Sequence, residues 1–236
     1  IDFLLLGDSF THGDCVSRPN DIGSVIRSIS KKSVINLGYR DNGPLAEYAT
    51  LREFSFKETK NLIWLFYEGG DIYDLASNLK YKQLNIYLED LSYSQKLKNK
   101  QEKVDQSGKE KIKKLLDSTK VEKSSINYNS LIKLRRIRSI VKNGYNYYFK
   151  PNIFSEDTHL YEKFKEIIYR TNEFSKKNNI NFFFVYIPAY ERYRNKEYDT
   201  TTYNNIIKII EELDVDFIDI NKEVFLNLEN PFILYP

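Results

Sequence analysis

Three uninterrupted apolar runs of strand length constrain the fold of this chain more than any other feature of its sequence. They read DFLLL at 2–6, NLIWLFY at 61–67 and INFFFVYIP at 180–188. A continuous apolar run of this length is typical of a strand that is buried on both faces of a parallel sheet. The runs therefore predict a covered parallel sheet at the centre of the molecule.

Segments whose apolar residues recur at helical spacing separate these runs, so strands and helices alternate along the chain. This alternation predicts an α/β fold in which a central, mostly parallel five-stranded sheet carries helices on both faces. The expected strands are 2–6, 33–38, 61–67, 180–188 and 215–220, and the expected helices are 21–31, 43–54, 158–178, 202–213 and one that begins at 71.

Residues 80–150 differ from the rest of the chain because they are rich in lysine and glutamine and only weakly amphipathic. We expect a helical insertion there, with a mobile stretch near 99–111, inside a single domain that spans 1–236. Basic runs of this kind usually form the solvated face of a helix. A lid or a partner-binding insertion is the sharper alternative.

The bulk composition excludes several classes of function. A net charge of +3 is small for a dedicated nucleic-acid-binding protein, so no nucleic-acid partner is expected. No apolar run approaches the roughly 20 residues that a membrane-spanning helix needs. Cys15 is the single cysteine of the sequence, which excludes an intrachain disulfide and a cysteine-built metal site. We predict no metal and no cofactor.

The sequence begins at Ile1, within a strand pattern, and it contains no methionine. We therefore expect a piece of a longer protein, truncated at both ends. The lack of a signal peptide is then uninformative, and the compartment stays open between the cytoplasm and the cell envelope.

Unusual residues follow three of the expected strands. They are Gly7-Asp8-Ser9, Asn36-Leu37-Gly38 and Glu68-Gly69-Gly70-Asp71. The carboxyl ends of parallel strands meet at one edge of a sheet, where ligands bind in open α/β folds. A serine there becomes a nucleophile when a base takes its proton, and acyl transfer also needs N–H donors for the developing oxyanion. The tripeptide at residues 7–9 also fits an ordinary polar turn.

The three blocks LLLGDSFTHGDCV, VINLGYRDNGPLAEYATLREF and IWLFYEGGDIYDL resemble, in order and separation, the first three blocks of the SGNH/GDSL hydrolase family. The resemblance covers residues 1 to about 78 and extends more weakly to the later strands. It implies a three-layer α/β/α flavodoxin-like fold and a serine esterase. Ser9 matches the nucleophile and one oxyanion donor, and Gly38 matches the second donor. Gly70 stands where the family has an asparagine that gives the third donor.

The sequence departs from the family at two places. Gly70 has no side-chain donor, and Asn42, in the second block, is the candidate to replace it. The family also carries a histidine just after its last strand, and no histidine follows residue 220 here. We expect the base to be a histidine beyond Pro236. The alternative, a base formed by Glu156 and His159, is disfavoured because that segment precedes the fourth strand.

The sequence thus predicts a bacterial serine esterase or O-acyltransferase that forms an acyl-Ser9 intermediate on an ester or an acylated glycan. His12, Asn42 and Glu68 are the predicted substrate-binding residues. The alternative is a non-catalytic module of the same fold that binds a glycan or a protein partner. A glycosidase pair of Glu68 and Asp71 is disfavoured, because adjacent loop acids usually bond backbone amides or meet solvent.

Overall fold

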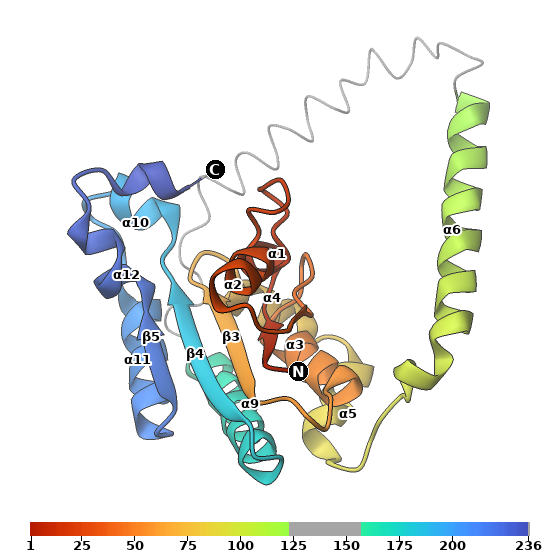
Figure 1. Ribbon diagram of the computed structural model, residues 1–236, viewed down its shortest axis with the longest axis horizontal. Coiled ribbons are helices and arrows are strands. Elements are labelled where there is room, and N and C mark those ends of the chain that lie inside the picture. Colours follow the sequence, from red (N-terminus) through yellow and green to blue (C-terminus); the bar gives the residue numbers. More distant parts are fainter. Residues whose placement is uncertain (123–156, 236) are drawn as a thin grey trace. The chain divides into compact units, whose positions relative to one another are not determined.

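The computed structural model describes residues 1–122 and 157–235, with side chains for 1–117 and 157–235. Its centre is a five-stranded sheet of order β2-β1-β3-β4-β5 in which all four strand pairs are parallel (Figure 1). This confirms the predicted α/β class and shows a fully parallel sheet. The strands are β1 (Phe3–Leu6), β2 (Val34–Asn36), β3 (Asn61–Tyr67), β4 (Asn181–Ile187) and β5 (Asp216–Asp219).

Successive side chains of each strand point to opposite faces of the sheet, and both faces are covered. Leu4, Trp64 and Phe184 belong to the larger core, which is completed by helices α3 (Pro44–Phe54), α9 (Thr158–Lys177) and α11 (Thr201–Glu212). Leu5 and Val185 belong to the smaller core on the other face, against which α2 (Ile22–Ser30) packs. These two layers of side chains explain why the strands read as continuous apolar runs.

The helix boundaries follow local chemistry that the sequence displays. Asp21 caps α2 by accepting the Ser24 N–H at 2.9 Å, and Pro44 occupies the first turn of α3. Short helices after β1, β4 and β5 were not expected. Outside residues 96–153, the other described helices are α1 (Ser9–His12), α4 (Asp71–Asn78), α5 (Lys82–Glu89), α10 (Tyr190–Arg194), α12 (Ile220–Glu223), η2 (Phe225–Asn227) and η3 (Pro231–Leu234).

The chain divides into two compact units, one made of Ile1–Gln95 with Phe154–Pro236 and the other of Lys96–Ile153. Residues 80–95, which the sequence analysis assigns to the insertion, therefore belong to the first unit. Arg52 and Glu53 of α3 bind them. The Arg52 guanidinium donates to the carbonyl oxygens of Tyr87, Leu91 and Tyr93. Glu53 Oε1 accepts hydrogen bonds from the Tyr87 hydroxyl, the Ser94 hydroxyl and the Gln95 N–H.

The described part of the second unit is helical. It consists of η1 (Leu97–Lys100) and α6 (Gln101–Glu122), so the stretch near 99–111 is a helix where the sequence analysis expected a mobile segment. Lysine, glutamate and glutamine are good helix formers, and here their propensity outweighs the single Gly108. Residues 123–150 of the predicted insertion lie outside the described residues. Among the described helices, none combines the length and the apolarity needed to cross a membrane.

We predict that Arg52→Lys lowers the free energy of unfolding by about 2–3 kcal/mol. A lysine ammonium cannot reach three carbonyl oxygens at once, and a hydrogen bond to a charged group contributes about 1.5–3 kcal/mol. Chemical denaturation monitored by circular dichroism measures the effect. Arg40→Lys is the control, because Arg40 is 65% exposed and forms a surface ion pair with Asp14, so its loss should cost below about 1 kcal/mol. Equal effects of the two variants would contradict the anchoring role of Arg52.

Candidate active site

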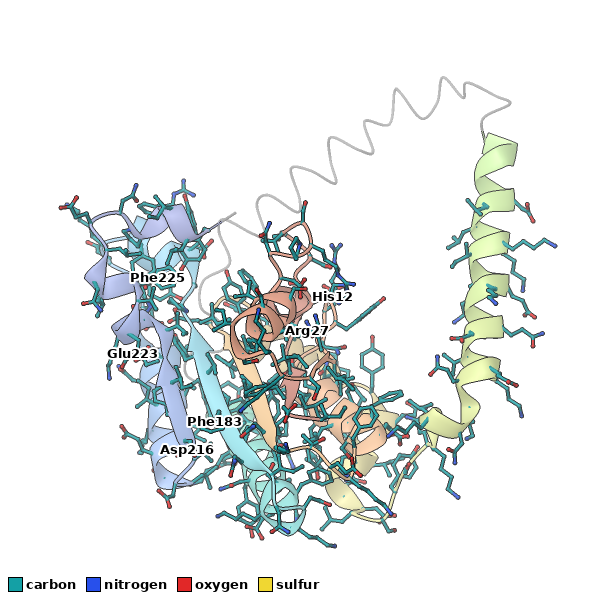
Figure 2. All side chains as sticks on the ribbon, in the orientation of Figure 1. His12, Arg27, Phe183, Asp216, Glu223 and Phe225 are labelled. Atoms are coloured by element: carbon teal, nitrogen blue, oxygen red, sulfur yellow. The ribbon has the colours of Figure 1, made fainter. Side chains whose placement is uncertain are left out.

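The three predicted strand ends lie side by side, because β1 lies between β2 and β3 in the sheet. The chain leaves β1 toward β2 and returns to pair β3 on the other side, so this edge is the point at which the strand order reverses. Open α/β sheets bind ligands at such a point. Figure 2 shows His12 toward the ends of the strands at which the arrows point, and Asp216 at the opposite ends.

Ser9 begins helix α1 immediately after β1 and is partly exposed. Its Oγ donates a long hydrogen bond of 3.5 Å to Asp8 Oδ2, while Asp8 Oδ1 accepts the Phe10 N–H at 2.8 Å. Burial raises the pKa of Asp8 above its ordinary value, although hydrogen bonds from the Phe10 and Thr11 N–H groups act in the opposite direction. Asp8 therefore caps the helix and orients the candidate nucleophile.

Gly7 is required for this turn. Its φ is +146°, and a Cβ placed there would lie 2.1 Å from Thr11 Oγ1 and 2.7 Å from the Leu65 carbonyl oxygen. Only a residue without a side chain fits both the backbone conformation and the space. The glycine that precedes Asp8 thus allows α1 to start directly against β3.

Gly38 also packs directly against α1, since a Cβ there would lie 2.6 Å from Thr11 Cβ and 2.8 Å from the backbone nitrogen of His12. The Gly38 N–H, the second expected oxyanion donor, donates to Asn36 Oδ1 at 2.8 Å. Asn36 Nδ2 in turn donates to the Thr11 carbonyl oxygen at 2.5 Å. The Asn36 carboxamide therefore joins the loop after β2 to α1. It also accepts the hydrogen bond of the Gly38 N–H, which is the group expected to donate to an oxyanion.

His12 lies at the end of α1. Its Nδ1 is 3.0 Å from the Gly38 carbonyl oxygen, and because a carbonyl only accepts, Nδ1 carries the proton. Its Nε2 faces Asp14 Oδ1 at 3.5 Å. Both nitrogens therefore face groups other than Ser9 Oγ. His12 also lines a cavity of about 360 Å³ whose other lining residues are Asp14, Tyr39, Arg40 and Asp41.

The end of β3 is joined to α1 by stacked aromatic rings. Phe10 and Tyr67 stack with their centroids 4.2 Å apart, and the Tyr67 ring lies where a Cβ of Gly69 would be. Gly70 has more room, because the nearest atom to a Cβ there is Tyr67 Cδ1 at 3.5 Å, and its φ is −138°. A side chain at position 70 is therefore compatible with the backbone and the space.

Glu68 is buried and its carboxylate is bound by protein groups. One oxygen accepts the Ala189 N–H at 2.9 Å and Arg192 Nε at 3.0 Å, and the other accepts Arg192 Nη2. Burial alone would lower the pKa of Arg192, but the hydrogen bonds and the charge of Glu68 hold it above its ordinary value. Glu68 thus joins the end of β3 to α10, and its substrate-binding role stays a prediction.

The other predicted residues are placed as follows. The Asn42 N–H closes a turn with the Tyr39 carbonyl oxygen at 3.2 Å. His159 is exposed in the first turn of α9, with Nδ1 4.0 Å from Glu162 Oε2, and Glu156 lies outside the described residues. The two histidines of the sequence both lie in described ranges, and neither hydrogen-bonds to Ser9 Oγ.

No protein-family model and no curated protein matches this chain. The solved structures that resemble it include the esterase AlinE4 and variants of it. A variant of the esterase AlinE4 has 10% sequence identity and a TM-score of 0.47, with 99% of this chain and 82% of that chain covered. AlinE4 itself, described as an SGNH-hydrolase family esterase, has 11% identity and a TM-score of 0.46, with 97% and 82% covered. A likeness of this degree assigns no activity to the chain.

We predict that Gly7→Ala destabilises the protein by about 3 kcal/mol or more, because it combines positive-φ strain with overlap against Thr11 and the β3 backbone. Gly70→Ala is the control, since its Cβ makes only ordinary contacts, and we expect a change below about 1 kcal/mol. Thermal unfolding of both variants measures the difference. A Gly7→Ala protein as stable as the wild type would show that α1 does not pack this closely on β3.

Proposed function

We propose that this chain is an esterase or acyltransferase of the SGNH type that uses Ser9 as its nucleophile. The observation that carries the proposal is the place of Ser9, at the carboxyl end of β1, beside the ends of both neighbouring strands. Its hydroxyl is partly exposed and hydrogen-bonds to the buried Asp8. An ester, including an acylated glycan, is the proposed substrate.

In the proposed reaction, Ser9 Oγ attacks the acyl carbon and a base takes its proton. The ester carbonyl oxygen becomes an oxyanion that accepts hydrogen bonds from the N–H groups of Ser9 and Gly38. Collapse of this intermediate breaks the bond to the alcohol oxygen, which takes the proton from the base and leaves. Water or an acceptor hydroxyl then removes the acyl group from Ser9.

The Gly38 N–H serves this reaction only if it is released from Asn36 Oδ1 or shared with it. Asn36 therefore holds the Gly38 N–H in place before substrate binds. Binding then exchanges the hydrogen bond to Asn36 Oδ1 for one to the substrate oxygen. This exchange is favourable when negative charge develops on the substrate oxygen, because hydrogen bonds to a charged acceptor are about twice as strong as neutral ones.

A second candidate function is a binding module without turnover, and the Asn36–Gly38 hydrogen bond favours it. In that case the strand ends keep their closed arrangement, Gly70 needs no side chain, and Ser9 is one polar contact to a glycan or a protein partner. The two candidates differ in the reactivity of Ser9, which is measurable without knowledge of the substrate.

We predict that a fluorophosphonate probe labels Ser9 and that Ser9→Ala abolishes this labelling. The probe reacts with an activated serine because its phosphorus resembles the acyl carbon under attack. Ser17→Ala, in the exposed loop after α1, is the control and should be labelled like the wild type. Mass spectrometry of the labelled peptide identifies the site. Equal labelling of the Ser9→Ala protein would remove Ser9 from the proposed mechanism, and no labelling of the wild type would favour the binding module.

Labelling of residues 1–236 should be slow. His12 Nδ1 is bound to Gly38, His159 is exposed on α9, and serine hydrolases that lack a triad member retain only about 10³–10⁴-fold acceleration over water. The same limit applies to the hydrolysis of p-nitrophenyl acetate by this chain.

We predict that Gly70→Asn raises kcat for p-nitrophenyl acetate by about tenfold, because the new amide supplies a donor at the end of β3. A native oxyanion donor contributes about 100–1,000-fold, and a smaller gain is expected from a loop that was not built to hold the amide. Gly70→Ala, which adds Cβ without a donor, should leave kcat unchanged. A folded Gly70→Asn protein with wild-type kcat would contradict a missing donor at this position.

A further inference from the structure

Two carboxyl groups with completely buried side chains lie in the helices that follow β2 and β3. Glu47 is in α3 and Asp71 begins α4, and both residues are 0% exposed. Each uses one oxygen to accept one hydrogen bond. Glu47 Oε2 accepts the Trp64 Nε1–H at 2.5 Å, and Asp71 Oδ2 accepts the Tyr67 N–H at 2.8 Å.

The other oxygen of each carboxyl group is left over. Glu47 Oε1 and Asp71 Oδ1 are both buried, and neither accepts a hydrogen bond from any residue that the structure describes. Neither group forms an ion pair with a lysine, arginine or histidine of the described ranges. Glu68, by contrast, is buried with the Arg192 guanidinium as its counter-ion.

Among the described residues, the charged groups named as acting on this pair are acidic. Burial raises the pKa of Asp71 well above its ordinary value, and repulsion from Glu47 is the next largest cause. Burial likewise raises the pKa of Glu47. Asp8, at the end of β1, and Asp74, on α4, repel both groups. Two ionised carboxylates without a cation would be very unfavourable in this place, because a buried charge that is not paired costs several kcal/mol.

We propose that Glu47 and Asp71 share one proton at neutral pH, as a carboxylic acid hydrogen-bonded to a carboxylate, and that this bond positions the turn after β3. A single proton satisfies both leftover oxygens at once and removes one of the two negative charges. The shared proton belongs to the pair and not to either residue.

The shared proton links three elements that hold the candidate site. Glu47 belongs to α3 and receives the indole N–H of Trp64 from β3. Asp71 starts α4 and receives the N–H of Tyr67, the last residue of β3. The turn at 68–70, which carries Gly70, lies in the chain between Tyr67 and Asp71 and is enclosed by their hydrogen bond. This inference goes beyond the proposed function and does not depend on it.

Infrared spectroscopy of the 236-residue chain in D₂O tests the proposal directly. A protonated carboxyl group has a C=O stretching band that is separate from the carboxylate bands. We expect this band at pD 7 in the wild type and expect it to be absent in both Glu47→Gln and Asp71→Asn. Glu53→Gln is the control, because Glu53 is buried but accepts hydrogen bonds from Tyr87, Ser94 and Gln95. It should keep the band.

The amide variants test whether Glu47 and Asp71 share a single proton. In Glu47→Gln the amide oxygen can accept the Trp64 indole N–H, and the amide nitrogen can donate to Asp71 Oδ1 in place of the shared proton. Each single variant should therefore fold. The double variant Glu47→Gln/Asp71→Asn turns two N–H₂ groups toward each other, and its unfolding constant should exceed the product of the single effects by about tenfold or more.

The stability of the fold should also depend on pH with a defined sign. The pKa values of the pair are raised in the folded state, so the unfolded chain loses the shared proton first as pH rises above about 4. Stability contributed by the pair then falls with rising pH. The wild-type unfolding constant, relative to that of Glu47→Gln, should increase by up to about tenfold per pH unit between pH 5 and the pH at which the folded protein releases the proton.

Absence of the protonated band from the wild type at pD 7 would overturn the proposal, as would its persistence in both amide variants. A ratio of unfolding constants that does not change with pH would do the same. None of these measurements uses enzymatic activity, so a protein without labelling at Ser9 can still show the shared proton. If an amide variant does not fold, the wild-type protein alone decides the question. The protonated-carboxyl band should be present at pD 7 and should disappear on titration to higher pD.

Discussion

The close approach of helix α1 to the sheet is the constraint on which the rest of the candidate site depends. It requires two positions without a side chain, Gly7 in the turn between β1 and α1 and Gly38 on the loop after β2. Because these backbones are in contact, the Asn36 carboxamide and the His12 imidazole each bridge the gap with one hydrogen bond. A larger residue at either glycine would separate Ser9 from the donors around it.

Buried acids near this edge are stabilised in two different ways. Glu68 has a guanidinium partner that also contacts aromatic rings, with Arg192 Cζ 4.7 Å from the ring centroid of Tyr203 and 5.3 Å from that of Tyr198. Among the described residues, Glu47 and Asp71 each accept one N–H hydrogen bond, and the proposed shared proton would join them. The first arrangement is an ion pair, whereas the second depends on the proposed shared proton. The turn after β3 begins at Glu68 and ends just before Asp71, so the ion pair holds one end of it and, in our proposal, the shared proton holds the other.

The sequence was sufficient to predict the strands and the meeting of their ends, because both follow from apolar run length and from the geometry of parallel sheets. The motif also singles out Ser9 and Gly38, whose roles stay a prediction. The sequence could not show that Asn36 binds the Gly38 N–H, because an asparagine at a strand end serves many turns equally well. Nor could it pair Glu68 with Arg192, since no local pattern joins residues 124 positions apart. Glu47 looks like a surface acid in sequence, but it is fully buried and accepts the indole N–H of Trp64.

The Glu68–Arg192 pair has a further consequence for the chain as a polymer. It joins residues on either side of the second unit in the sequence, so everything between them forms one closed loop. The entropic cost of closing a loop grows only with the logarithm of its length, by about 0.6 kcal/mol for each doubling. A change of the inserted unit to half or twice its size would therefore alter the stability of the sheet by less than one surface hydrogen bond does. The loop-closure entropy therefore places only a weak constraint on the length of that unit.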